Sequence, residues 1–387
     1  MIIPAARRTE SVKEYYFSKK NRQIAEMNAD GRTEPIINLG IGSPDGRPPQ
    51  AAIDELCSTA VLDGVHAYQS YTGIPELRKA FAGWYDRWYG VKLDPAKEIQ
   101  PLTGSKEGIL ITSMAFLNKG DKVLVPDPGY PTYSSAARLC EAEIVYYDLV
   151  ESRGWQPDLE ALEASDLSGV KMMWTNYPNM PTGAPADPAL YEKLVDFGRR
   201  HGIMICNDNP YSFILTENHY SILSVPGAKD CCLELNSLSK AHNMAGWRLG
   251  MVASSADVIY EILKVKSQLD SGIFRPLQLA AVEALAQGPE WFSELNAEYT
   301  RRRAAAGKIF DALGIKYNPA SQGLFLWGRV PEGVEPVELS DKLLHEAGVF
   351  ITPGFIFGHN GDKYMRVSLC ATVEKLGRAL EKIKAVI

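Results

Sequence analysis

The sequence predicts an α/β fold with two parts: a large domain, built on a mainly parallel sheet with helices on both faces, and a smaller α/β domain. The 387 residues, 45% of them hydrophobic, are sufficient for one large and one smaller core. From residue 121 onward, short β-rich runs alternate with helical stretches, which is typical of a doubly covered parallel sheet. Beyond residue 290, two helical stretches flank an apolar run, which predicts the smaller domain.

The predicted strands of the large sheet are short and mostly apolar. They are residues 122–126, 143–148, 170–174, 202–206, 231–235 and 249–253. Helices are expected within 11–34 and over 76–89, 257–268, 291–313 and 372–387, with the apolar run of the smaller domain at 323–327. Pro75 suits the first turn of the helix over 76–89. The N–H groups of a first turn have no partner within the helix, so the missing N–H of proline costs nothing there.

Charge and cysteine content narrow the class of protein. The net charge of -6 disfavours a nucleic-acid-binding surface, which needs clustered positive charge, so a small-molecule partner is expected. The six cysteines lack Cys-Xaa-Xaa-Cys spacing and predict reduced thiols, and no metal site is predicted. Neither a signal peptide nor a membrane span is recognisable. We therefore expect a soluble, cytoplasmic protein.

One lysine follows the predicted strand 231–235. The stretch Ser237-Leu-Ser-Lys240 places an amine at the carboxyl edge of the sheet, where open α/β sheets bind ligands. Lys240 is a candidate Schiff-base nucleophile, while Ser237, Ser239 and Arg248 can bind an anion. This set suits a phosphorylated aldehyde. The alternative is a surface lysine in a loop.

A second anion site is predicted at the start of the helical run 109–117. Gly104-Ser105 is a turn before this run, and free N–H groups at a helix start attract anions. The next residue, Lys106, either brings its charge into a functional site or is a solvated lysine at the start of the helix. The sequence leaves both open.

Two further positions carry charge into apolar surroundings. Asp208 follows the predicted strand 202–206 and is either a helix cap or a functional carboxylate. Arg366 lies in the apolar run Tyr364-Met-Arg-Val-Ser-Leu369 and requires an anion, because burying a lone guanidinium is costly. That anion is either an internal Asp or Glu or the carboxylate of a substrate.

The stretch from Ser237 to Gly250, together with motifs along the whole chain, resembles the class I and II aminotransferases. The resemblance implies the fold-type I architecture and pyridoxal 5′-phosphate as cofactor. It implies that Lys240 forms the Schiff base, that Asp208 pairs with the pyridinium N–H and that Tyr211 donates to the phenolate oxygen. The divisions that it implies are an N-terminal arm with part of the small domain (1–45), a large cofactor-binding domain (46–288) and a small C-terminal domain (289–387).

The resemblance assigns the remaining site residues as well. The cofactor phosphate would lie against Ser105, Lys106, Ser237, Ser239 and Arg248, with Tyr130 stacked on the ring. In some family members a lysine in the turn of Lys106 reads the distal carboxylate of an acidic substrate, and the resemblance implies this role for Lys106 too. The substrate carboxylate would meet Arg366 and the backbone of Gly40, and Tyr68 would reach the cofactor phosphate of the other subunit, which implies a homodimer with active sites at its interface.

The loop Tyr177-Pro-Asn-Met-Pro-Thr-Gly183 departs from the family pattern. Its second asparagine, a donor to the cofactor, is Met180 here, and a thioether cannot donate a hydrogen bond. Asn179 or Asn176 is expected to take this role.

The expected reaction moves an amino group from an L-amino acid, with aspartate favoured, to a 2-oxo acid such as 2-oxoglutarate. LL-diaminopimelate, alanine and aromatic amino acids are alternative donors, and a C–S β-lyase of the same fold is an alternative activity. A DNA-binding regulator is disfavoured, because the stretch before Ile36 is too short for a winged-helix module and the net charge is negative.

Overall fold

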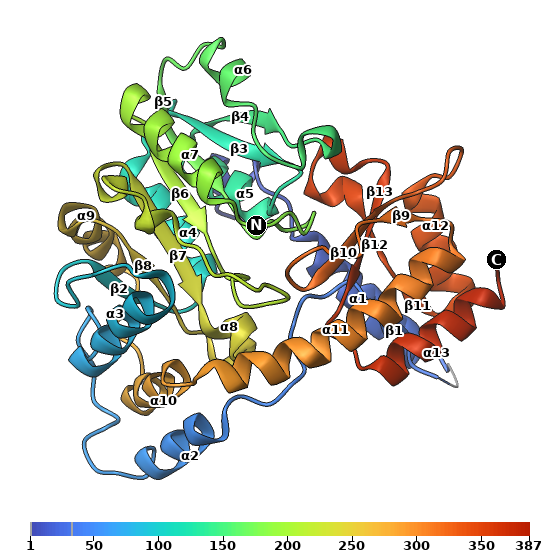
Figure 1. Ribbon diagram of the computed structural model, residues 1–387, viewed down its shortest axis with the longest axis horizontal. Helices are drawn as coiled ribbons and strands as arrows, with labels where there is room; N and C mark the ends of the chain where they lie inside the picture. The colour runs from blue at the N-terminus through green and yellow to red at the C-terminus, as the bar shows by residue number, and fades with distance from the viewer. Residues whose placement is uncertain (1, 32–33) are drawn as a thin grey trace.

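The computed structural model describes residues 2–31 and 34–387, and a seven-stranded sheet forms its larger half (Figure 1). The strands, in spatial order, are β2 (Ile99–Leu102), β8 (Gly250–Ala253), β7 (Cys232–Ser237), β6 (Met204–Asp208), β5 (Val170–Thr175), β3 (Lys122–Asp127) and β4 (Glu143–Asp148). From β7 to β4 all neighbours are parallel, whereas β8 runs antiparallel to both β7 and β2. The carboxyl ends of the parallel strands therefore meet at one edge.

Helices cover both faces of this sheet because its buried strands are apolar on both sides. Along β5, Met172 and Trp174 belong to one core, while Met173 between them belongs to the other. One face carries α4 (Ser105–Phe116), α5 (Pro131–Leu139) and α9 (Ala256–Lys266). The opposite face carries α3 (Pro75–Tyr89), α7 (Pro188–His201) and α10 (Arg275–Leu285), with α2 (Gln50–Thr59) packed on α10.

The smaller half contains a four-stranded antiparallel sheet. Its strands, in order, are β12 (Thr352–Pro353), β13 (Tyr364–Ser368), β10 (Phe325–Arg329) and β9 (Lys316–Tyr317). Its helices are α11 (Pro289–Ala312), α12 (Pro336–Lys342) and α13 (Val373–Lys384), and β1 (Ile37–Asn38) pairs in parallel with β11 (Val349–Phe350) beside it. In α13, Leu376, Ala379 and Ile383 are buried at helical spacing and fix the packed face.

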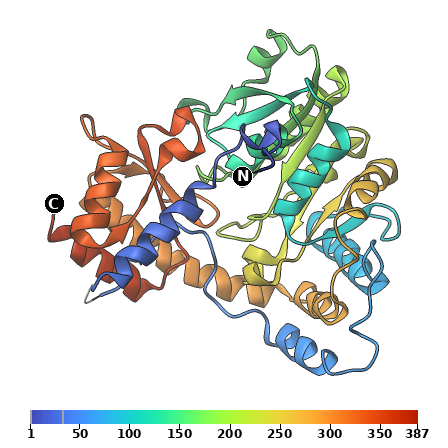
Figure 2. The same cartoon turned by 180° about the vertical axis from the view of Figure 1, so that it is seen from behind.

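One helix runs from one half to the other, and a second borders the space between them. α11 starts beside α8 (Leu238–Ala241), where Trp291 Nε1 donates a 2.8 Å hydrogen bond to the Ala241 carbonyl, and ends against β10 and α13 (Figures 1 and 2). α1 (Tyr16–Ala29) lies on the smaller half, where Ile24 packs with Ile36, Leu344 and Phe350. Both helices therefore border the space between the two sheets.

All six predicted strands of the large sheet are present, with shifts of up to two residues at their ends. β2 escaped prediction because Gln100 and Pro101 interrupt its apolar pattern. The helix expected within 11–34 spans only 16–29, and residues 32–33 of that expectation lie outside the described part of the chain. A short helix of the large half, α6, covers Leu159–Glu163.

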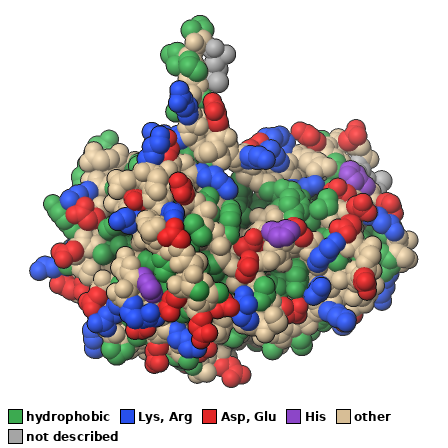
Figure 3. Space-filling model, turned by 90° about the horizontal axis from the view of Figure 1, so that it is seen from above, with side chains coloured by type: hydrophobic (Ala, Val, Ile, Leu, Met, Phe, Trp, Pro, Cys, Tyr) green, Lys and Arg blue, Asp and Glu red, His purple; other side chains and the backbone are tan. Residues whose placement is uncertain are grey.

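Charges of both signs are interspersed on the face in Figure 3, without a continuous basic field. This agrees with the net charge of -6. Within residues 2–31 and 34–387, no helix combines the length and apolar character that crossing a membrane requires.

Candidate active site

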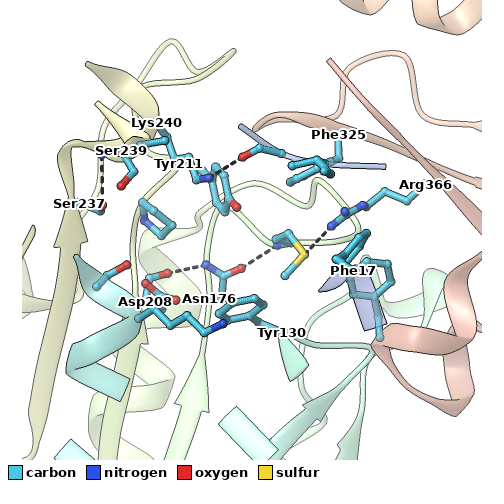
Figure 4. A pocket seen from close by; sticks show the side chains of 18 of the residues that line it. Phe17, Tyr130, Asn176, Asp208, Tyr211, Ser237, Ser239, Lys240, Phe325 and Arg366 are labelled. Atoms are coloured by element: carbon cyan, nitrogen blue, oxygen red, sulfur yellow. Dashed lines mark hydrogen bonds between the residues drawn. The ribbon is translucent and has the colours of Figure 1, made fainter. Parts of the chain in front are cut away.

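A cavity of about 320 Å³ opens at the carboxyl edge of the large sheet and extends to the smaller half (Figure 4). Eleven of the residues predicted from sequence line it. They are Gly40, Ser105, Lys106, Tyr130, Asp208, Tyr211, Ser237, Ser239, Lys240, Arg248 and, from β13, Arg366. Residues from distant parts of the chain thus meet in one place, as expected where parallel strands end.

Lys240 projects into this cavity from α8, directly after β7. Its Nζ donates a 2.6 Å hydrogen bond to the carbonyl of Gly42, so the amine is held across the cavity by the N-terminal segment. Burial lowers the pKa of Lys240, and the positive charges of Arg248 and Arg366 lower it further. The amine is therefore closer to its neutral, nucleophilic form than an exposed lysine.

An anion cradle surrounds the start of α4. Ser105 is the first residue of α4, so its backbone N–H is among those without a helical partner. Gly104 has φ +83°, and a Cβ there would collide with the Arg248 guanidinium, which shows how closely Arg248 approaches the turn. Ser237 and Ser239 line the same end of the cavity.

Asp208 is the last residue of β6, and only one of its two carboxylate oxygens has a hydrogen-bond partner. Tyr133, stacked on Trp174, donates a 2.9 Å hydrogen bond from its hydroxyl to Oδ2 of Asp208. Oδ1 is buried and has no hydrogen-bond partner among the described residues. Burial raises the pKa of Asp208 to about 7, although the Tyr133 bond lowers it. This carboxylate is poised to accept a proton or a hydrogen bond from a bound group.

The loop after β5 brings Asn176, not Asn179, to the cavity. Asn176 Nδ2 donates to the Asp208 carbonyl at 2.5 Å, and its Oδ1 accepts from the N–H of Met180. Asn179 does not line the cavity, because its amide is used within the loop by Asn176 and Thr182. The prediction that Asn179 binds the cofactor is therefore corrected, and Met180 occupies the cavity wall.

Tyr211 reaches the cavity wall just beyond β6. Its side chain is 8% exposed, and burial raises the pKa of its hydroxyl well above the ordinary value. The hydroxyl therefore stays protonated at neutral pH and is available as a donor.

Arg366 is 3% exposed, and no acidic residue in the described chain pairs with it. Its Nη2 donates to the Gly40 carbonyl at 2.7 Å, its Nη1 contacts the Met180 sulfur at 3.2 Å, and its buried Nε lacks a partner. The rings of Phe325 and Phe357 lie 3.8 and 4.4 Å from Cζ. An internal salt bridge is thereby excluded within residues 2–31 and 34–387, and the guanidinium retains capacity for an external anion.

Sequence reasoning missed the N-terminal contribution. Tyr15 and Phe17, at the start of α1, line the cavity, and Lys106 Nζ lies 4.4 Å from the centre of the Tyr15 ring. The aromatic residues were recognisable in the sequence, but their place at the site depends on how the N-terminal segment crosses between the halves. Tyr133 was also missed, although it lies three residues from the predicted Tyr130.

Tyr68 lies away from the cavity of its own chain and is 90% exposed. Phe274 and Tyr71 are exposed on the same part of the molecule, where His66 stacks on Phe274 and Gly272 abuts the backbone of residues 69–70.

Comparison with known proteins identifies the family. The family model for aminotransferases of class I and II matches residues 34–383. The chain belongs to this family. It is thus a pyridoxal-phosphate-dependent aminotransferase of fold type I.

Curated relatives and solved structures support this membership. An LL-diaminopimelate aminotransferase of Dehalococcoides mccartyi is 38% identical over 380 residues, covering 98% of this chain and 97% of the relative, and one of Nitratidesulfovibrio vulgaris is 39% identical, with 98% of each covered. Substrate-bound BacF from Bacillus subtilis superimposes with a TM-score of 0.94, 32% identity and coverage of 99% and 98%. An aspartate aminotransferase variant from Thermus thermophilus gives a TM-score of 0.91 at 27% identity, with both chains fully covered.

The residues present fit pyridoxal 5′-phosphate. The buried, unpartnered Oδ1 of Asp208 suits a protonated ring nitrogen, and the cradle of Ser105 and Arg248 suits a phosphate. Lys240 supplies an amine for the aldehyde. The aminotransferase therefore has matched groups at three separate points of the cavity.

Proposed function

We propose that this aminotransferase transfers the amino group of an L-amino acid with a second, distal carboxylate to a 2-oxo acid such as 2-oxoglutarate. The observation that carries the proposal is the position of Lys106, which lines the same cavity as Lys240 and Arg366 and has no acidic partner among the described residues.

The cofactor would be held by the large half of the molecule. Lys240 Nζ would bind its aldehyde carbon, the Asp208 carboxylate its ring nitrogen and the Tyr211 hydroxyl its ring oxygen, while Tyr130 would stack on the ring. The N–H of Ser105, the two serines that flank Leu238 and the guanidinium of Arg248 would hold the phosphate. When bound, the cofactor supplies an electron sink for the charge that develops at the substrate's Cα.

Lys240 then serves a second purpose as a proton carrier. With its Nζ free and neutral, Lys240 would accept the proton from the substrate's Cα and would deliver it to the cofactor carbon that had carried the aldehyde. The lowered pKa of Lys240 favours this neutral form. Asp208, through its ionised carboxylate, would hold the proton on the ring nitrogen.

Arg366 would bind the substrate's α-carboxylate. The guanidinium borders the cavity, its Nε has no partner and its Nη1 meets only a thioether sulfur, so it retains donors for a carboxylate, while Nη2 is held by the Gly40 carbonyl. A Cβ at Gly40 would lie 2.5 Å from the Phe350 ring, so only glycine fits the close approach here. Arg366 fixes every amino acid alike and therefore leaves the choice of side chain to other residues.

Lys106 would make that choice. Once the phosphate, the aldehyde and the α-carboxylate have taken Arg248, Lys240 and Arg366, it is the remaining cation among the lining residues. A distal carboxylate on the donor would complete its charge pairing. Aspartate has such a group, and so does LL-diaminopimelate, the compound in the names of the curated relatives.

We further infer that the working form is a homodimer in a reducing compartment, such as the cytoplasm. Tyr68 at 90% exposure is free to reach a partner's phosphate site, and all six cysteines are unpaired. We also keep the division at residues 45 and 288 as a proposal, since Gly288 caps the first turn of α11.

The test is a donor panel with 2-oxoglutarate: aspartate, LL-diaminopimelate, alanine and phenylalanine, measured on the wild type and on Lys106→Ala. A charge-assisted hydrogen bond contributes about 1.5 to 3 kcal/mol, so kcat/KM for donors with a distal carboxylate should fall by roughly 10- to 100-fold while alanine is unaffected. The matched control is Lys119→Ala, a surface lysine far from the cavity. An equal loss for alanine and aspartate would remove Lys106 from substrate selection.

The same assay separates transamination from β-elimination. An aminotransferase turns over only while a 2-oxo acid is present, whereas a C–S β-lyase releases pyruvate from a cysteine conjugate without one. Sustained pyruvate release in the absence of any oxo acid would favour the lyase.

A further inference from the structure

Asp127 joins the two halves of the molecule beside the active site. It is the last residue of β3, and its side chain points to the segment between β12 and β13. Oδ2 accepts the backbone N–H of His359 and Oδ1 accepts that of Asn360, both at 3.0 Å. We name this arrangement, a carboxylate with two backbone amides, the Asp127 latch.

Further contacts reinforce the latch. Asn360 Nδ2 donates to the Asp127 carbonyl at 3.0 Å and to Asp148 at 2.7 Å. Gly358 has φ +139°, and a Cβ at this position would collide with Oδ1 of Asp127, so the turn is shaped to bring the carboxylate close. The Asp127 side chain is buried, which makes its two amide bonds stronger than bonds at the surface.

The latch is directly connected to both walls of the active-site cavity. On one side, Gly129 donates its N–H to the Phe357 carbonyl at 2.7 Å, and the neighbouring Tyr130 lines the cavity. On the other side, Phe357 lines the cavity and its ring lies 4.4 Å from the Arg366 guanidinium. The position of Phe357 over Arg366 therefore depends on a segment that is anchored at both Gly129 and Asp127.

We propose that Asp127 is a positioning residue for substrate binding: through the latch it holds Phe357 against Arg366 and so fixes the guanidinium in the orientation that receives the substrate's α-carboxylate. This inference rests on the role proposed above for Arg366. The aromatic ring on one face of the guanidinium limits the orientations that the guanidinium can adopt. A guanidinium that is already oriented loses less conformational entropy when it binds a carboxylate. Asp127 itself does not line the cavity.

The first test is Asp127→Asn, which keeps the side-chain shape but removes the charge and one acceptor. The KM for the amino acid should rise about tenfold, the effect of losing one charge-assisted contact, while kcat changes less than about twofold. Hydrogen exchange of the His359 and Asn360 amides should accelerate, and the visible spectrum of the holoenzyme should stay the same. Gly358→Ala, which pushes the latch apart from the other side, should raise KM in the same way.

The matched control is Asp121→Asn. Asp121 precedes the opposite end of β3, and its carboxylate likewise accepts a backbone N–H, that of Asn118 at 2.7 Å, but it lies at the edge away from the cavity. This variant should leave KM and the exchange at 359–360 unchanged. A KM rise equal to that of Asp127→Asn would show a general stability effect and overturn the inference.

A double-mutant cycle with Phe357→Leu isolates the route of the effect. If the latch acts through the ring, Asp127→Asn should add less than about twofold to KM in the Phe357→Leu background. Independent, multiplicative effects would overturn the inference. Arg366→Lys separates it from the proposed function: unchanged KM in that variant would refute the role of Arg366, whereas faster amide exchange in Asp127→Asn would still report an opened latch.

Discussion

The Tyr133 hydroxyl donates a 2.9 Å hydrogen bond to Oδ2 of Asp208 and leaves Oδ1 of the same carboxylate buried without a partner. A buried acceptor without a partner costs free energy in the folded protein, and such groups concentrate at functional sites. Tyr133 is itself held by stacking on Trp174, so the carboxylate is oriented before any ligand arrives. Asp208 is thus prepared for one hydrogen-bond donor.

We predict that Asp208→Ala folds normally but is a poor catalyst. Loss of the carboxylate removes the group that keeps a ring nitrogen protonated, and the loss of such an electrostatic contribution typically slows the chemical step by about 10³ or more. Cofactor affinity should also fall. Single-turnover measurement of Cα–H cleavage with a deuterated amino acid reports the step directly. Turnover at the wild-type rate would mean that another group holds the ring proton.

We predict a pH dependence for the cofactor-free protein. The pKa of Asp208 is raised from 3.8 to about 7, so between these values the folded chain binds a proton that the unfolded chain has lost. The free energy of unfolding should therefore fall as pH rises through this window. Between pH 5 and 7 the contribution is on the order of 2 to 3 kcal/mol.

Urea unfolding of the wild type and of Asp208→Asn at about pH 5 and about pH 7 measures this change in the free energy of unfolding. The asparagine variant cannot titrate, and the difference between the two proteins should grow as pH rises. Identical pH slopes in the two proteins would show that Asp208 titrates near its ordinary value.

We predict that replacing glycine with alanine weakens ligand binding at Gly104 but stabilises the fold at Gly83. Gly104→Ala forces a side chain into φ +83° and against Arg248, so affinity for the cofactor and for inorganic phosphate should fall at least tenfold. Gly83→Ala lies on the exposed face of α3 with free space around its Cβ, and should stabilise the protein by about 0.5 to 1 kcal/mol. Fluorescence titration and thermal melting measure the two. If Gly104→Ala binds phosphate as tightly as the wild type, the turn at Gly104 does not form the phosphate site.

The strands and the residues at their carboxyl ends were predictable from the sequence. Mostly apolar runs such as Val170–Thr175 are typical of parallel strands, which are covered by helices on both faces. Lys240 and Asp208 follow such runs directly, so their meeting at one sheet edge follows from topology. Arg366 was recognisable because a guanidinium in an apolar strand requires an anion.

The remaining parts of the site depend on contacts that no local pattern encodes. Asn176 and Asn179 are three residues apart with the same side chain, and only the path of the loop decides which one reaches the cavity. Phe17 lines the site because α1 packs on the smaller half through Ile24. The role of Asp127 could not be predicted, because its partners are backbone amides, which carry no signature in the sequence.

The central claim, that Lys240 carries the cofactor, is tested most directly by borohydride reduction of the yellow holoenzyme followed by peptide mass spectrometry. Reduction makes the bond between a lysine and the cofactor permanent, so the modified residue is read from the peptide. The account predicts the cofactor-derived mass on the peptide that contains Lys240, and neither this mass nor the visible absorbance band in Lys240→Ala. Attachment to Lys106, the other lysine of the cavity, or an unchanged spectrum in Lys240→Ala would contradict it.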